Sequence, residues 1–174
     1  MQSYQENYTV VDIETTGLSP QYDDIIELSA LKVRNNEIVE EFSSLLQSQK
    51  GVNNFIADLT GITNKMLVSA PKIDEVMPKF LSFIEDDTIL GHNVNFDMRF
   101  IKNKTQKVLN RNLDNPTMDT MILAKSNLRL YNYKLATIAQ YYDIDTKNNH
   151  RGLKDCYITF EVYNKLRENA LALR

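Results

Sequence analysis

Two carboxylates stand near the end of an apolar stretch close to the start of the chain. In VVDIETTGLSP, residues 10–20, Asp12 and Glu14 flank Ile13 and follow two valines. On a strand, residues two apart point to the same face and lie about 6.6 Å apart along the chain. Carboxylates at this spacing can bridge a hard divalent cation, which offsets the cost of burying their charge. The alternative is an exposed edge strand with acids placed by chance, and the apolar neighbours argue against it.

A third acidic residue opens the apolar face of a helix predicted in the middle of the chain. In GHNVNFDMRF, Asn93 is a favourable helix N-cap and Asp97 follows in or near the first turn. Asp97 shares a helical face with Ile101 and Val108, so its side chain is expected to point toward the protein. The alternative is an exposed acid that only stabilises the helix dipole, and this stretch by itself leaves both interpretations open.

The same pattern recurs near the end of the chain. In HRGLKDCYITFEVYNKL, Asp155 shares a helical face with Thr159 and Val162. His150 precedes this helix, in a loop expected to lie over its first turn. A lone loop histidine is usually a surface residue, so the interest of His150 depends on its position beside Asp155.

Together these positions predict a site for metal-dependent phosphoryl transfer. Four carboxylates in one place repel each other unless cations neutralise them. Two divalent ions about 3.5 to 4 Å apart are the usual arrangement, and such sites catalyse in-line displacement at phosphorus. A histidine beside them would accept a proton from attacking water near neutral pH. The four acids are Asp12, Glu14, Asp97 and Asp155, and the histidine is His150.

The segments that carry these residues change from strand patterns to helix patterns along the chain. Residues 8–14 predict a strand, and residues 23–46 predict two more that Asn35-Asn36 joins as a two-residue hairpin turn. A strand meander followed by alternating strands and helices predicts an α/β fold with a mixed sheet. The later elements are a helix after Pro71, a short strand in DTILGHN, a helix from about Asn93 or Val94, a short strand in TMDT, and helices over about 119–129, 134–142 and 152–172.

The composition predicts one domain, residues 1–174, because 174 residues that are 43% apolar suffice for a single core. A net charge of −3 argues against a broadly cationic surface, although bound cations would still allow nucleic acid to bind. Cys156 is the only cysteine, which excludes an internal disulfide and a cysteine zinc site. Neither a signal peptide nor an apolar segment of membrane-spanning length is visible, so we expect a cytoplasmic protein without membrane association.

The three acidic motifs resemble those of the DEDDh, or DnaQ-like, family of 3′→5′ exonucleases, which includes the proofreading epsilon subunit of bacterial DNA polymerase III. The motifs are VVDIETTGLSP, HNVNFDMRFI and HRGLKDC. IIELSALKV, LTGIT, MDTMILAK and YKLATIAQYYDI add to the similarity, so the resemblance runs from about Tyr8 to Leu166.

The resemblance implies a ribonuclease H-like α/β fold with a five-stranded mixed sheet. It implies that the four acids hold two divalent metal ions, Mg²⁺ or Mn²⁺, and that His150 is the general base. Family members often carry a histidine just before the Gly-Ile-Thr turn, where this chain has Thr60. A role for that position in seating the base is therefore in question.

The resemblance also implies contacts to the substrate. The main chain near Thr15 and Gly17, together with Leu18, would hold the 3′-terminal nucleotide. Phe96 would pack near the site, and Asn93 would brace the second motif.

The predicted function is therefore a 3′→5′ exonuclease that releases 5′-mononucleotides from a single-stranded or frayed 3′ end of DNA, in proofreading or repair. The resemblance allows a DNA polymerase as partner, and it equally allows a stand-alone enzyme. Two alternatives stay open. One is an exoribonuclease with the same chemistry that trims RNA. The other is a degenerate member that binds nucleic acid without cutting it, which the presence of all five catalytic residue types disfavours.

Overall fold

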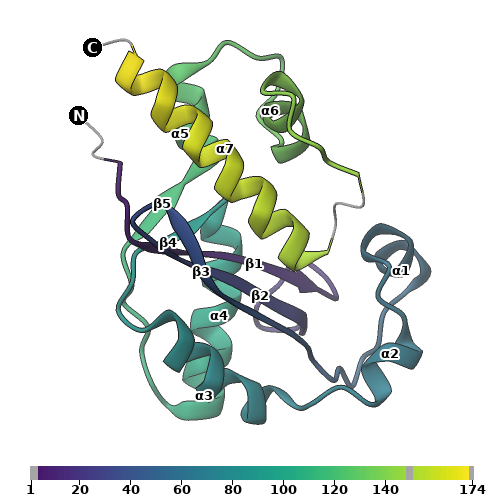
Figure 1. Ribbon diagram of the computed structural model, residues 1–174. Helices are drawn as coiled ribbons and strands as arrows, with labels where there is room; N and C mark the ends of the chain where they lie inside the picture. The colour runs from purple at the N-terminus through teal and green to yellow at the C-terminus, as the bar shows by residue number, and fades with distance from the viewer. Residues whose placement is uncertain (1–3, 148–150, 173–174) are drawn as a thin grey trace.

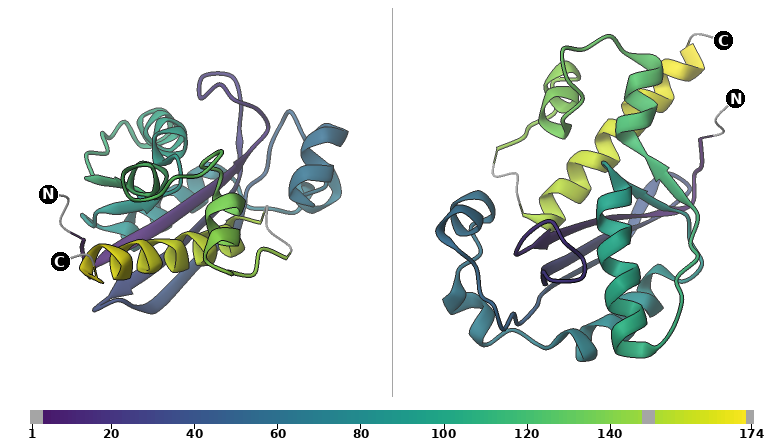
Figure 2. Two further views of the ribbon diagram at one scale, coloured as in Figure 1. Left: turned by 90° about the horizontal axis from the view of Figure 1, so that it is seen from above. Right: turned by 180° about the vertical axis from the view of Figure 1, so that it is seen from behind.

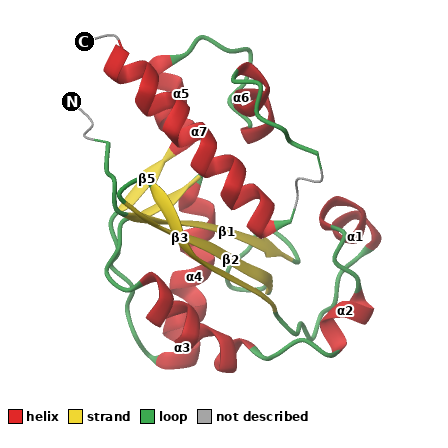
Figure 3. Ribbon diagram, viewed as in Figure 1, coloured by secondary structure: helices red, strands yellow, loops and turns green. Residues whose placement is uncertain are grey.

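A mixed five-stranded sheet of order β3-β2-β1-β4-β5 forms the centre of the protein (Figures 1 and 3). The computed structural model describes residues 4–147 and 151–172. The strands are β1 (Tyr8–Thr15), β2 (Ile25–Arg34), β3 (Glu37–Leu45), β4 (Ile89–Gly91) and β5 (Thr117–Asp119). The first three form an antiparallel meander, and β4 and β5 run parallel to β1. The predicted mixed sheet of five strands is confirmed.

Helices cover both faces of the sheet (Figure 2). They are α1 (Asn54–Thr60), α2 (Asn64–Val68), α3 (Ile73–Ile84), α4 (Val94–Leu109), α5 (Thr120–Asn127), α6 (Leu135–Tyr141) and α7 (Gly152–Ala172). Side chains of α3 and α4 share one apolar core with the sheet, and those of α5, α6 and α7 share a second core. Among the described helices, none combines the length and apolarity needed to cross a membrane.

The predicted hairpin turn is confirmed at Asn35-Asn36, where both residues have positive φ angles of 53° and 63°. This conformation matches a type I′ turn, whose twist suits the antiparallel strands on either side. Asparagine adopts it at lower cost than most residues, so the local sequence fixes where β2 ends and β3 begins.

Helices α1 and α2 were not predicted. They are only seven and five residues long, too short for a clear helical period in the sequence. Each is capped by its preceding residue, because Asn53 accepts a hydrogen bond from the Ile56 N–H and Thr63 accepts one from the Met66 N–H. Their few apolar residues form a small separate core beneath the start of β2.

The alternation of side chains along β1 decides where its carboxylates point. Val11 and Ile13 enter the core on the side of α3 and α4, whereas Val10 enters the core on the side of α7. Asp12 and Glu14 follow the parity of Val10 and therefore face α7. The first turn of α7 lies beside the end of β1, so the helix covers the strand where the acids stand (Figure 1).

Candidate active site

Three of the predicted acids meet between the end of β1 and the start of α7. Asp12, Glu14 and Asp155 each offer one carboxylate oxygen such that the three oxygens lie within 4.8 Å of one another. Asp155 is buried in the first turn of α7, and Thr159 and Val162 on the same helical face are buried as well. Carboxylate oxygens at this separation form a donor set suited to a hard divalent cation.

Asp97 approaches the same strand from α4, on the other side of the sheet. The carboxylate is buried, as is Ile101 on the same helical face, and Oδ1 accepts a hydrogen bond of 3.0 Å from the Ile13 N–H. The pairing of β1 with β4 stops at Val10, so Asp97 supplies an acceptor where the sheet no longer does. Asp97 is not one of the three acids in the 4.8 Å cluster, but it is close enough that its charge adds to the effect of burial in raising the pKa of Asp12.

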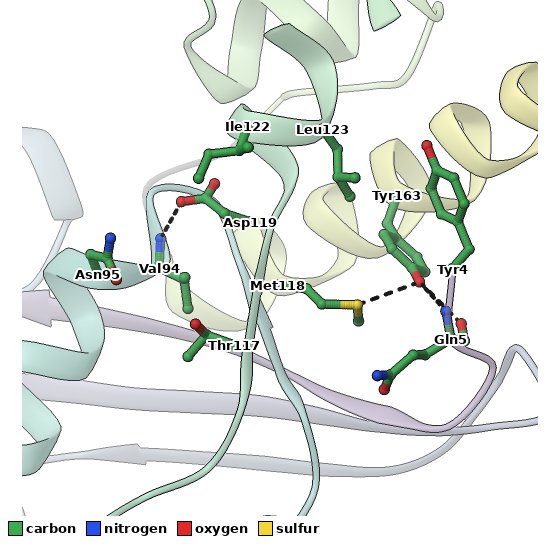
Figure 4. A pocket seen from close by; sticks show the side chains of 10 residues that line it. All are labelled: Tyr4, Gln5, Val94, Asn95, Thr117, Met118, Asp119, Ile122, Leu123 and Tyr163. Atoms are coloured by element: carbon green, nitrogen blue, oxygen red, sulfur yellow. Dashed lines mark hydrogen bonds between the residues drawn. The ribbon is translucent and has the colours of Figure 1, made fainter. Parts of the chain in front are cut away.

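Asn93 occupies the N-cap position of α4, as predicted, but its side chain does not form the cap. Asn93 is in the left-handed conformation, with φ 59° and ψ 43°, and its side chain makes no capping hydrogen bond. Instead Asp119, at the end of β5, accepts hydrogen bonds from the Asn93 N–H at 3.0 Å and from the Val94 N–H at 3.2 Å. Figure 4 shows the second of these bonds. Asp119 also caps α5 through the Met121 N–H, so one carboxylate starts two helices. Sequence reasoning missed this role of Asp119, and the only signal was an acid at the end of a short strand.

The pocket drawn in Figure 4 lies beside this cap, between β5, α4, α5 and α7. Its volume is about 280 Å³, and its lining contains none of the residues predicted for the active site. The cluster of acids therefore lies outside this pocket, and the chemistry expected of the cluster follows from its carboxylates.

The loop after β1 is held by internal hydrogen bonds and presents an apolar side chain to solvent. The Thr15 hydroxyl donates to the Gly17 carbonyl at 2.6 Å, and Asp23 accepts from the Ser19 N–H at 2.9 Å. A Cβ atom on Gly17 would lie 2.5 Å from that Asp23 carboxylate, so a side chain cannot be accommodated there without movement. Leu18 is held between these contacts with 80% of its surface exposed.

Two other predicted positions have structural partners. Phe96 is partly buried against the α3–α4 core, with its ring 5.2 Å from that of Phe100. Thr60 is buried; its hydroxyl donates to the Ile56 carbonyl and accepts from the Ile62 N–H. Thr60 therefore closes the turn between α1 and α2. His150 lies outside the described residues, so its position relative to the acids stays a prediction.

The other histidine is occupied in the fold. His92 is half-buried between β4 and α4, and its Nδ1 lies 2.9 Å from the Thr120 hydroxyl. Burial lowers the pKa of His92, so the ring is neutral near pH 7.

In the absence of metal, burial and repulsion between the acids raise the pKa values of three of them. Burial, followed by repulsion from Asp97 and Glu14, raises the pKa of Asp12 well above its usual value. Burial, followed by repulsion from Asp155, raises the pKa of Glu14 to about 8. Burial raises the pKa of Asp97 to about 7 despite the hydrogen bond from Ile13. A divalent cation would reverse this repulsion and favour the ionised acids.

These shifts predict an unusual pH dependence of stability. In chelator, the free energy of unfolding should fall as the pH rises from 6.5 to about 8. Glu14 and Asp97 hold protons in this range when folded and release them when unfolded, because their unfolded pKa values are near 4.5 and 3.8. This contribution to the free energy of unfolding is complete below about pH 4 and is lost as the pH passes about 8. The slope is about 1.4 kcal/mol per pH unit for each proton that the folded state binds in excess of the unfolded state.

The measurement is chemical denaturation at several pH values, in chelator and in saturating Mn²⁺. Glu14→Gln should flatten the slope in chelator, and Mn²⁺ should remove it in the unmutated protein. A stability that rises with pH between 6.5 and 8 in chelator would contradict this assignment of raised pKa values.

The sheet order and the acids at the end of its central strand define a ribonuclease H-like α/β protein, and comparisons with known proteins narrow this class. The sequence model of the exonuclease family matches residues 9–163. DNA polymerase III subunit epsilon of Aquifex aeolicus is 37% identical over 162 residues, 92% of this chain and 80% of the relative. The chain therefore belongs to the exonuclease family, and the resemblance seen in its motifs is confirmed.

Other relatives are much longer than this chain. The PolC-type DNA polymerase III of Thermotoga maritima is 39% identical over 156 residues, which are 90% of this chain but 11% of that protein. Among solved structures, E. coli Exonuclease I in complex with a dT13 oligonucleotide superposes with a TM-score of 0.82 at 18% identity, over 97% of this chain and 42% of the other. At 18% identity this superposition supports only the fold, whereas membership of the exonuclease family rests on the family model and the sequence relatives.

Proposed function

We propose that residues 1–174 form one exonuclease domain that hydrolyses DNA from the 3′ end with the help of two divalent metal ions. The observation that carries this proposal is that carboxylate oxygens of Asp12, Glu14 and Asp155 lie within 4.8 Å of one another. Asp97, on α4, accepts a hydrogen bond from the main chain of β1 between Asp12 and Glu14. In an exonuclease, such carboxylates have a direct use as ligands for the ions that activate water and neutralise phosphate charge.

The donor set fits Mg²⁺ or Mn²⁺. The clustered ligand atoms are all carboxylate oxygens. Such oxygen ligands suit hard cations better than they suit softer metals. Bound ions would lower the pKa of a water molecule and stabilise the charge that develops on the phosphate. Four acids carry up to four negative charges, a number that two divalent ions balance.

The residues of the chain itself would divide the remaining tasks. His150 would accept the proton of the attacking water. The main chain near Thr15 and Gly17 would hold the terminal nucleotide, and the exposed Leu18 would pack against its base or sugar. Asn93 and Phe96 would support the start of α4, from which Asp97 reaches the site.

The proposal of DNA as substrate rests on the names of the sequence relatives. A DNA polymerase III epsilon subunit and PolC-type polymerases share 37% and 39% identity with this chain, so proofreading beside a polymerase, in the cytoplasm, is the role we favour. A single-stranded or frayed 3′ end is the form of DNA that such a site would accept. RNA remains the alternative substrate, because none of the site residues distinguishes a 2′-hydroxyl.

A labelled oligonucleotide tests the proposed polarity and product. Water would attack the last phosphodiester in line, and the 3′-oxygen of the preceding nucleotide would leave, giving a 5′-mononucleotide. A 5′-labelled single-stranded DNA should therefore shorten as a descending ladder in Mg²⁺ or Mn²⁺. Matched DNA, RNA and mispaired primer ends, compared by initial rate, identify the substrate. Immediate release of the labelled mononucleotide would show the opposite polarity, and full turnover in chelator would exclude metal dependence.

A further inference from the structure

Glu27 is a buried carboxylate on the same face of the sheet as Asp12 and Glu14. It lies on β2 directly opposite Glu14 on β1, with 2% of its surface exposed. Its oxygens are already engaged. Oε1 forms an ion pair of 3.0 Å with Arg151, and Oε2 accepts a hydrogen bond of 3.0 Å from the Gly152 N–H. Glu27 therefore binds the start of α7 rather than facing open solvent.

The start of α7 lies directly against β2 at this point. A Cβ atom on Gly152 would lie 2.6 Å from the Ser29 hydroxyl and 3.5 Å from Glu27 Oε2. Ser29 is the residue of β2 opposite Asp12, and the Cys156 thiol lies 3.5 Å from the Ser29 carbonyl. Only a glycine allows the helix to begin this close to the strand that pairs with the acidic strand.

One further contact connects this anchor to the cluster. The Arg151 carbonyl accepts a hydrogen bond of 3.0 Å from the Asp155 N–H, in the first turn of α7. Arg151 is thus fixed by its side chain to Glu27 and by its main chain to Asp155. The carboxylate of Glu27 also faces the helix N-terminus, where a negative charge is favoured.

We propose that Glu27 is a positioning residue for the metal site. By binding Arg151 and the Gly152 N–H, it fixes the first turn of α7 so that Asp155 meets Asp12 and Glu14. This inference rests on the proposed function, since it concerns the ligands of the proposed metal ions. Glu27 does not itself bind the ions, because both of its oxygens are used by the helix start.

A purely electrostatic role of the pair gives a different expectation. If Glu27 and Arg151 acted only through their charges, removing the negative residue would weaken metal binding and removing the positive one would strengthen it. If the contact positions Asp155, both removals weaken binding. The sign of the effect of an Arg151 substitution therefore separates the two roles.

The experiment is a titration of Mn²⁺ into the metal-free protein by isothermal calorimetry, with variants Glu27→Gln and Arg151→Met. We expect each variant to bind Mn²⁺ about 10- to 100-fold more weakly, the usual effect of losing a group that orients a metal ligand. The double variant should bind Mn²⁺ no more weakly than the single variant with the lower affinity, because each substitution removes the same contact. Arg151→Lys should restore part of the affinity.

Arg34→Met is the matched control. Arg34 lies on the same strand as Glu27, near the other end, and forms an ion pair of 2.9 Å with Asp87. Its loss should leave Mn²⁺ affinity unchanged. The Arg151 side chain is 46% exposed, so Arg151→Met is expected to fold even if the buried Glu27→Gln does not.

The outcomes separate this inference from the proposed function. If the unmutated protein binds Mn²⁺ and Arg151→Met binds it as well or more tightly, the positioning role is overturned and the metal site stands. If the unmutated protein binds no Mn²⁺, both are overturned. Weaker binding by Arg151→Met, with Arg34→Met unchanged, supports the positioning role.

Discussion

Asp97→Asn is expected to abolish hydrolysis while the fold remains intact. The amide oxygen of asparagine can still accept the hydrogen bond from the Ile13 N–H, which alanine would leave unsatisfied in a buried position. The negative charge that would hold a metal ion is lost. Bound metal supplies several kcal/mol of stabilisation to the transition state, so we expect a loss of roughly 10³-fold or more in rate.

Stability provides the control for this variant. In chelator at pH 8, Asp97→Asn should unfold at the same temperature as the unmutated protein or higher, because a buried carboxylate with a raised pKa has been removed. Its stabilisation by Mn²⁺ should be strongly reduced. A variant that keeps most of its activity at saturating Mn²⁺ would remove Asp97 from the metal site.

His150→Ala is expected to slow the chemical step without weakening metal binding. The proposed base contacts water and does not hold the ions, and general-base catalysis typically contributes about 10² to 10⁴ in rate. At saturating Mn²⁺, kcat should fall by about this factor, and the rise in melting temperature caused by Mn²⁺ should persist. The rate of the unmutated protein should also fall as the pH drops through the pKa of the histidine.

Two further variants sharpen the assignment of the base. His150→Gln can hold the water but cannot take its proton, so it should be nearly as slow as His150→Ala. His92→Gln should have little effect on kcat, because the His92 ring is bound to Thr120 and carries no proposed catalytic role. Retention of most activity by His150→Ala, with loss of activity in His92→Gln, would reverse the assignment.

The sequence was sufficient for features that depend on local periodicity. Alternation along β1 places Asp12 and Glu14 on one face, and the helical period places Asp97 and Asp155 at the head of buried stripes. The left-handed preference of asparagine identifies the turn at Asn35-Asn36. These features need only neighbouring residues, so they can be recognised without knowing how the chain folds back on itself.

The tertiary structure alone decided which groups satisfy one another across the chain. Asp119 caps a helix that begins 25 residues earlier in the sequence, in place of the expected Asn93 side chain. Glu27 anchors a helix start 125 residues away, and its strand pattern gave no sign of this contact. Buried polar groups need partners wherever the fold places them, and those partners are chosen by strand register and helix docking. The sequence was thus sufficient to propose which residues carry the chemistry, whereas the packing of α7 on β1 and β2 decided how Asp155 meets Asp12 and Glu14.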